Sequence, residues 1–253
     1  MMIFDNEVST KAKENYSNSA PWPENDEWHK CTFLIEKKTV ELWLNRLAHN
    51  DMVVLNAGSG GTTYEAPGKM IHFDIIEDYV KGFDNYLVGA VEKIDLPDNS
   101  VDGIICVGSV LNYANLQKAV SEFARILKRN GFFIIEFERS DSAEFLFKKE
   151  HHAYVFCKEY CYNQQKHLLW MYSEKHVRQV LKQYNLRVNK STRIHCLSTL
   201  FNRFGLAEQK SARFCSLDKL MQPISYSIAH NVLMLGTKQL PPKRNNRNSP
   251  GDN

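Results

Sequence analysis

The chain has 253 residues, of which 43% are hydrophobic, and it carries a formal net charge of +3. This length and composition suffice for one sizeable α/β domain or two small ones. The slight excess of basic residues is spread along the chain rather than clustered, so it does not by itself indicate nucleic-acid binding.

The six cysteines follow no spacing typical of a disulfide framework or of a paired C-x-x-C zinc site. The opening residues, MMIFDNEVST, lack a basic region followed by an apolar one, so we expect no signal peptide. No apolar run approaches the roughly 20 residues that span a bilayer. These features predict a soluble, cytoplasmic protein in a reducing compartment, with no membrane contact.

The first 30 residues are polar apart from Tyr16, Trp22 and Trp28, and we expect an irregular arm there. The stretch from Thr32 to Asn50 has apolar residues at nearly helical spacing. Farther along, short apolar strands alternate with helical patterns, which is typical of βαβ units and a parallel sheet. The expected strands are 52–55, 69–75, 87–91, 101–108 and 131–138, and the helical patterns between them are 77–86 and 116–128.

The rhythm changes after Ser140. We expect an added hairpin at 153–160 and 166–173, a helix at 173–184, a strand at 186–195, a polar helical stretch at 198–228 and a last strand at 229–238. The tail, residues 241–253, has little apolar content and is expected to be disordered. We therefore predict an N-terminal arm or lid (1–30) and one domain (31–240) with lid insertions at about 141–172 and 198–228.

A glycine-rich loop follows the first strand, in MVVLNAGSGGTTY (52–64). Because glycine lacks a Cβ, such a loop lets a ligand approach the backbone N–H groups, although a tight turn alone would also explain it. The next strand ends in Asp74, where a ribose diol would need a carboxylate acceptor. Together these features favour a nucleotide-like ligand at the carboxyl ends of the strands.

Four motifs in order resemble those of the class I S-adenosylmethionine-dependent methyltransferases. VVLNAGSGGTT resembles the first motif, HFDII the second, AVEKIDLPDNSVDGII the third, and LKRNGFFIIEFE the strand that follows. The resemblance covers roughly residues 33–140, with a similar ending at 229–238. It implies an α/β, doubly wound, mostly parallel seven-stranded sheet of the Rossmann-like kind, here with an added hairpin and helical lid, and S-adenosyl-L-methionine as cofactor.

The resemblance also implies which residues contact the cofactor. Gly58 and Gly60 would face its amino acid part, Asp74 its ribose hydroxyls, and Val91 with Glu92 its adenine. The chain departs from the family pattern at Asn56, where an acidic residue is common, at Thr62, which replaces the third glycine, and at Ala90, where an Asp often receives the adenine amino group. Asn56 could still position the amino group through its side-chain carbonyl. Further expected contacts are Ile75, Val107 and Tyr16.

A nicotinamide cofactor is the alternative ligand for such a loop. Dinucleotide-binding loops favour G-x-G-x-x-G, and the sixth position counted from Gly58 is Thr63. The segment EKIDLPDNSVD is also characteristic of methyltransferases. The methyltransferase interpretation is therefore favoured.

The methyl acceptor should lie over the ends of the fourth and fifth strands, CVGSVLNY and EFERSDS. Arg139 is our first candidate there, as an anchor for a carboxylate or phosphate, followed by Tyr113, His195 and His230. Aromatic residues of the hairpin could wall the acceptor pocket or belong to the core. These are Tyr154, Phe156, Trp170 and Tyr172.

Some chemistries are disfavoured by the sequence. The [D/N]-P-P-[Y/F] motif of amino-methylating DNA enzymes is replaced by VGSV, and no Pro-Cys pair of the cytosine-C5 type occurs. Cys106 lies in an apolar run and is expected in the core. We predict no metal site, and we interpret the His and Cys residues of the hairpin as an ordinary strand edge, namely His151, His152, Cys157, Cys161 and His167.

These observations predict an enzyme that methylates oxygen or nitrogen of a small molecule. An RNA or protein methyltransferase is the alternative, supported only by the basic balance and the tail. A non-catalytic cofactor-binding subunit that serves as a scaffold is a third, because of the departures at Asn56, Thr62 and Ala90. The sequence identifies neither the acceptor nor an oligomeric state.

Overall fold

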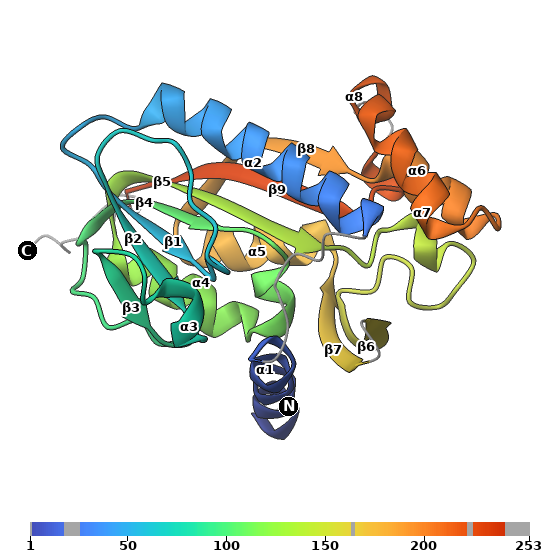
Figure 1. Ribbon diagram of the computed structural model, residues 1–253, viewed down its shortest axis with the longest axis horizontal. Helices are drawn as coiled ribbons and strands as arrows, with labels where there is room; N and C mark the ends of the chain where they lie inside the picture. The colour runs from blue at the N-terminus through green and yellow to red at the C-terminus, as the bar shows by residue number, and fades with distance from the viewer. Residues whose placement is uncertain (1, 18–25, 163–164, 222–224, 241–253) are drawn as a thin grey trace, which may run out of the picture.

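The computed structural model describes residues 2–17, 26–162, 165–221 and 225–240. Seven strands form one sheet in the order β3-β2-β1-β4-β5-β9-β8 (Figure 1). Strands β1 to β5 run parallel, whereas β9 is antiparallel to both β5 and β8. The predicted doubly wound, mostly parallel sheet is confirmed. Its strands are β1 (Val53–Ala57), β2 (Lys69–Asp74), β3 (Tyr86–Val88), β4 (Val101–Cys106), β5 (Leu127–Glu138), β8 (Leu186–Ile194) and β9 (Asn231–Lys238).

Helices cover both faces of the sheet (Figure 1). Helix α2 (Glu27–Leu47) packs Val40 and Trp43 against one face, and α4 (Leu116–Ile126) and α5 (Glu174–Gln183) cover the other. Each helix presents one apolar stripe to the sheet, as amphipathic helices do. The central strands are therefore buried on both sides, and Cys106 lies in this core as expected.

The additions gather beside the carboxyl ends of the central strands. Strands β6 (Val155–Tyr162) and β7 (Gln165–Tyr172) form the predicted antiparallel hairpin. The polar stretch after β8 folds as short helices, α6 (Cys196–Arg203), α7 (Glu208–Ser211) and α8 (Asp218–Met221). The remaining elements are α3 (Glu77–Val80) and four 3-10 helices, η1 (Val110–Tyr113), η2 (Ala143–Phe145), η3 (Ala212–Leu217) and η4 (Ser225–Ser227).

The expectation of an irregular N-terminal arm is wrong. Residues Met2–Tyr16 form helix α1, which lies against β7 and η1 (Figure 1). The helix buries a narrow stripe made of Val8, Ala12 and Asn15, and the Asn15 side-chain amide donates a hydrogen bond to the Lys166 carbonyl at 2.9 Å. A stripe of two small apolar residues and one amide is too weak a signal in a polar segment.

Helix α2 begins earlier than expected, because Asp26 caps it. The Asp26 carboxylate accepts hydrogen bonds from the backbone N–H groups of Trp28 and His29, as an N-cap does. Trp28 therefore belongs to a helix rather than to an arm. Trp22 and the tail 241–253, which was expected to be disordered, lie outside the described residues.

Several element boundaries also differ from the predictions. The third strand ends at Val88, the helix expected at 77–86 has a single turn, and α4 gives way directly to β5 at Leu127. Leu127 pairs with Val101, and a register shift follows, near the positive φ of 61° at Asn130. Gly131 therefore lies inside β5.

Cys31 of α2 and Cys215 of η3 form a disulfide across 184 residues of chain. The spacing of the cysteines did not predict this bond, because a long separation along the chain leaves no pattern to recognise. The bond joins the start of α2 to the helical insertion. Among the described residues, no helix has both the length and the apolar content needed to cross a bilayer.

Candidate active site

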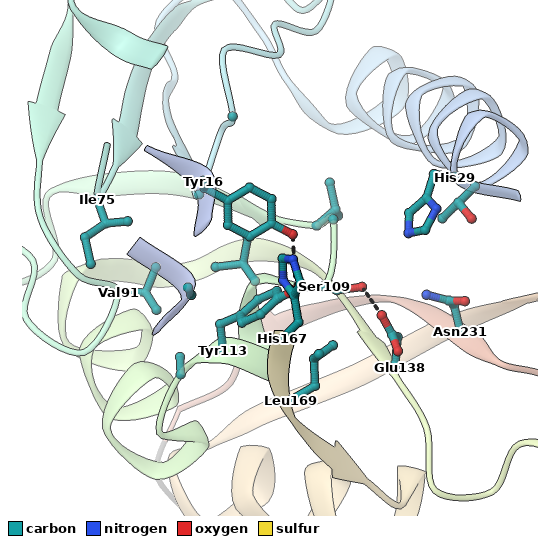
Figure 2. Close-up of a pocket in the computed structure, with 18 of the residues that line it drawn as sticks. Tyr16, His29, Ile75, Val91, Ser109, Tyr113, Glu138, His167, Leu169 and Asn231 are labelled. Carbon is teal, nitrogen blue, oxygen red and sulfur yellow. Dashed lines mark hydrogen bonds between the residues drawn. The ribbon is translucent and has the colours of Figure 1, made fainter. Parts of the chain in front are cut away.

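A cavity of about 320 Å³ lies at the carboxyl ends of the parallel strands, between the sheet, α1 and the hairpin. Residues from both ends of the chain line it. Figure 2 shows Ile75 and Val91 on one side, Tyr16, Tyr113 and His167 in the middle, and Glu138, Asn231 and His29 on the other. Its volume is at the lower end of the range for small-molecule sites, about 300–1,000 Å³.

The glycine loop after β1 forms one wall of the cavity. Gly58, Gly60 and Gly61 all have positive φ, at 69°, 52° and 77°, in the region that favours glycine. A Cβ at Gly58 would also collide with the side chain of Val110. Gly58 therefore serves the packing of η1 against the loop as well as the conformation of the loop itself.

Asp74, at the end of β2, holds this loop in place. Its Oδ2 accepts a hydrogen bond from the Gly60 N–H at 2.8 Å, and its Oδ1 accepts one from the Ile76 N–H at 2.9 Å. Burial raises the pKa of Asp74 above its ordinary value, although these N–H groups oppose the shift. A carboxylate has about four acceptor positions, so two remain for a ligand in the cavity.

Asn56 does not line the cavity, contrary to the expected cofactor contact. Its side-chain amide donates a hydrogen bond to the Thr62 carbonyl at 2.8 Å, which ties the two ends of the glycine loop together. Thr62 itself lines the cavity. The asparagine is therefore a structural element of the loop.

Val91 and Glu92, which were expected near the adenine, line the cavity, and so do two further expected cofactor contacts, Ile75 and Val107. Ala90, one of the departures from the family pattern, lies among them. Glu92 is held in place by α4, because its Oε1 accepts a hydrogen bond from the Asn115 N–H at 3.0 Å. Apolar side chains at Ile75 and Val91 can flank a flat ring, as in most small-molecule sites.

A row of hydroxyl and imidazole groups crosses the middle of the cavity. The Tyr16 and Tyr113 hydroxyls lie 3.1 Å apart, and the Tyr113 hydroxyl lies 3.2 Å from His167 Nδ1. Tyr79 donates a hydrogen bond to the Tyr16 carbonyl at 2.6 Å. Tyr16 and Tyr113 were expected near the site, whereas His167 was interpreted as part of a strand edge. The row joins α1, η1 and β7 in one wall.

Glu138, the last residue of β5, is the main group that the sequence analysis missed. Its Oε1 accepts a hydrogen bond from the Ser109 hydroxyl at 3.1 Å, and its Oε2 lies 3.3 Å from His230 Nε2. Burial alone would raise the pKa of Glu138, but the hydrogen bond and charge of His230 outweigh it and lower the pKa. Glu138 lies in EFERSDS, so its position at a strand end was the available signal.

Other acidic groups of the cavity are paired or lie at its rim. Glu144 accepts a hydrogen bond from the Tyr160 hydroxyl at 3.0 Å and forms an ion pair with Lys158. Burial lowers the pKa of Lys158 to about 8. No Lys or Arg is found among the described residues that line the cavity, although five carboxylates are: Asp74, Glu92, Glu138, Glu144 and Glu208.

Arg139 is not an anchor in the cavity, and that prediction is wrong. Its side chain is fully buried away from the cavity, where it donates hydrogen bonds to the carboxylate of Asp141 and the carbonyls of Ala229 and Tyr226. Glu174 lies 3.5 Å from it. The chain turns inward after β5, so Arg139 joins β5 to α5 and η4.

His195 is likewise absent from the cavity lining. It is fully buried, its Nε2 lies 2.8 Å from the Thr32 hydroxyl, and its ring stacks on Trp28 with centroids 3.9 Å apart. Burial lowers the pKa of His195 well below its ordinary value, so the ring is neutral. Its role is to support α2. His230, the fourth candidate, does line the cavity.

S-adenosylmethionine fits this cavity by the chemistry of the residues present. The glycine loop exposes backbone where a Cβ is absent, Asp74 has acceptor capacity left for a ribose diol, and apolar side chains lie where adenine would.

Comparison with known proteins also indicates a methyltransferase. Residues 57–135 match the family model for the methyltransferase domain. No curated protein sequence matches the chain. The matched segment is about a third of the chain. Together with the fold, this match supports the resemblance seen in the sequence to the S-adenosylmethionine-dependent methyltransferases, and with it a methyltransferase activity that uses this cofactor.

Two similar solved structures illustrate the fold. One is the 1,6-didemethyltoxoflavin-N1-methyltransferase of Burkholderia thailandensis, with its substrate and S-adenosylhomocysteine bound. It is 13% identical, with a TM-score of 0.55 over 93% of this chain and 91% of that one. The other is the methyltransferase bound to the Trm112 methyltransferase activator of Haloferax volcanii. It is 17% identical, with a TM-score of 0.57 over 92% of this chain and 98% of that one.

Proposed function

We propose that this methyltransferase transfers a methyl group to an oxygen or nitrogen atom of a small molecule. The observation that carries the proposal is the continuous cavity, which runs from Asp74 and the glycine loop to Glu138 and His230 and is walled by α1 and the hairpin. A small acceptor can be enclosed there beside the cofactor. The toxoflavin enzyme of similar fold also acts on a small molecule.

The lining argues against an RNA acceptor. Proteins that bind nucleic acid place Lys and Arg against the phosphates. The described lining of this cavity has neither residue. Since Arg139 is not an anchor, no Lys or Arg in the described part of the lining can hold an anionic acceptor group.

We further propose how the chain holds the cofactor. The backbone around Gly60 faces the amino acid part, Asp74 accepts hydrogen bonds from the ribose hydroxyls, and Ile75 and Val91 flank the adenine. Tyr16 and Val107 complete the walls. Asn56 acts indirectly, by fixing the loop.

The bound cofactor supplies a methyl group already activated on a sulfonium, so the protein mainly has to align the acceptor and exclude water. Helix α1 serves the second task in this proposal. It covers the cavity through Tyr16, whose hydroxyl meets that of Tyr113 and whose carbonyl is held by Tyr79. The predicted role of the N-terminal segment as a lid thus remains a proposal, now made for a helix.

The test measures which class of acceptor receives a labelled methyl group. The protein is incubated with S-adenosylmethionine labelled in its methyl group and, separately, with the small-molecule, RNA and protein fractions of a cell extract. Label should enter the small-molecule fraction only. It should not do so with Asp74→Asn, whereas Asp78→Asn, on the exposed surface of α3, should behave as wild type. Label that enters only the RNA or protein fraction would contradict the proposal.

A further inference from the structure

The acceptor end of the cavity carries negative charge. Among the described residues, the permanently charged groups that line the cavity are carboxylates. The inference below rests on the proposed function, because it concerns what occupies this end when the cofactor occupies the other.

Glu138 is the charged group at this end. It is partly buried, and its side-chain partners among the described residues are a hydroxyl and an imidazole: the Ser109 Oγ lies 3.1 Å from Oε1 and the His230 Nε2 lies 3.3 Å from Oε2. The lowered pKa of Glu138 keeps it ionised at neutral pH. Neither partner is a Lys or Arg, so part of its acceptor capacity stays available to a ligand.

Asn231 lies beside Glu138 and is held in place by the neighbouring strand. Its side-chain nitrogen donates a hydrogen bond to Glu136 Oε1 at 2.7 Å, which fixes the orientation of the amide. Its Oδ1 has no hydrogen-bond partner among the described residues and is shielded even from the cavity, which Asn231, only 3% exposed, lines next to Glu138 (Figure 2). The carboxylate of Glu138 is therefore the charged acceptor at this end of the cavity.

Aromatic rings form much of the surrounding wall. Tyr113 and Tyr160 line the cavity from η1 and β6, and Trp28 lines it from α2. Aromatic faces attract cations and do not attract anions. Lys158 does not line the cavity and is paired with Glu144, and its Nζ lies over the Tyr160 ring, 3.6 Å from the centroid, so Tyr113 and Trp28 are the rings left for a guest. The wall therefore favours a positively charged guest.

We propose that the methyl acceptor is a small amine, whose nitrogen binds at Glu138. The ammonium form donates N–H bonds to the Glu138 carboxylate. One proton then passes to Glu138, and the nitrogen lone pair forms the new C–N bond while the S–CH₃ bond breaks and sulfur keeps its electron pair. The product is a methylated ammonium, and Glu138 returns its proton to water after release.

Three ligands of nearly equal size test the charge preference: benzylamine, benzyl alcohol and benzoate. Each is titrated calorimetrically into protein saturated with S-adenosylhomocysteine. Benzylamine should bind about tenfold more tightly than the alcohol, because a hydrogen bond to a charged group contributes about 1.5 kcal/mol or more. Benzoate should bind most weakly. This comparison uses the wild-type protein and needs no variant.

Glu138→Gln then assigns the preference to one residue, and it should bring benzylamine and benzyl alcohol to within about threefold of each other. Glu159→Gln is the matched control, because Glu159 is an exposed carboxylate of the β6–β7 hairpin that does not line the cavity and is paired with Lys166 at 3.0 Å. It should leave the preference unchanged.

Equal affinities for the three ligands, no binding of benzylamine, or a preference that survives in Glu138→Gln would overturn the amine assignment. A titration of the free protein with S-adenosylhomocysteine is done before the three ligands are added. It separates a failure of the amine assignment from a failure of the proposed function. If S-adenosylhomocysteine does not bind, the cofactor site is wrong, whereas normal binding without an amine preference removes only the acceptor class.

Discussion

Replacing Asp74 with Asn should weaken cofactor binding strongly, and the structure indicates by how much. The carboxylate already accepts the Gly60 and Ile76 N–H groups, and in our proposal its remaining acceptor positions take the ribose hydroxyls. Hydrogen bonds to a charged group contribute about 1.5–3 kcal/mol. The loss corresponds to roughly a tenfold to 150-fold increase in Kd. Because Asn turns an NH₂ group towards one of the two backbone donors, the loop also loses support.

Calorimetric titration with S-adenosylhomocysteine measures this change directly. Thermal unfolding of each variant shows whether the protein remains folded. Asp78→Asn is the control, because Asp78 is exposed on α3, four residues away, and its described partner is Lys81. An affinity of Asp74→Asn within about twofold of wild type would refute the assignment of Asp74 to the ribose.

The affinity should also depend on pH through Asp74. Burial raises the pKa of Asp74, so the carboxylate becomes protonated at a higher pH than an ordinary Asp. Because the ionised form is the one that accepts both ribose hydroxyls, affinity should fall on acidification through this raised pKa. The dependence should be absent in Asp74→Asn. A curve of identical shape in both proteins would assign it to another group.

Three further outcomes are expected. Gly60→Val should abolish S-adenosylhomocysteine binding with native circular dichroism, because its φ of 52° disfavours a branched side chain; persistent binding would make the loop a mere turn. If α1 is a lid, S-adenosylhomocysteine should slow limited proteolysis within Met2–Tyr16, and equal rates with and without it would exclude a response to the ligand. Arg139→Leu should lower the free energy of unfolding by about 3–5 kcal/mol, because Asp141 and Glu174 lose a buried partner. It should not change cofactor affinity in the folded protein. Chemical denaturation measures the first effect, and titration with S-adenosylhomocysteine measures the second.

The sheet and the cofactor end of the cavity could be predicted because their signals are local. Apolar runs of four to eight residues mark buried strands, and each run is complete within its own segment. The loop from Gly58 to Gly60 and the carboxylate of Asp74 follow directly after two of these runs. In a parallel sheet, such strand ends meet at one edge, so sequence position alone brings the groups together.

The acceptor end could not be predicted in the same way, because strand ends do not determine where a side chain points. Glu138 and Arg139 are neighbours in the sequence, yet Glu138 lines the cavity and Arg139 is buried behind it. What separates them is contact with distant segments. Arg139 lies beside Glu174, and Glu138 lies beside His230. Neither pairing leaves a pattern in the local sequence.

Helix α1 shows a second limit. A helix that packs against a hairpin rather than the core needs only a narrow contact stripe, and Val8 and Ala12 provide it. Most stability of short helices comes from tertiary packing rather than from propensity. A polar segment can therefore be helical in the folded protein while its sequence shows no amphipathic period.

Asn56 shows how far a family motif can be carried over. A carboxylate at this position could only accept hydrogen bonds and would repel the Thr62 carbonyl, whereas the Asn56 amide donates to that carbonyl at 2.8 Å. An acidic residue at this position would offer a charged group to the ligand, whereas Asn56 holds the two ends of the loop together. The motif predicts the path of the loop correctly, because the glycines determine that path. It does not predict the contact of a residue whose hydrogen-bonding capacity differs from that of the family.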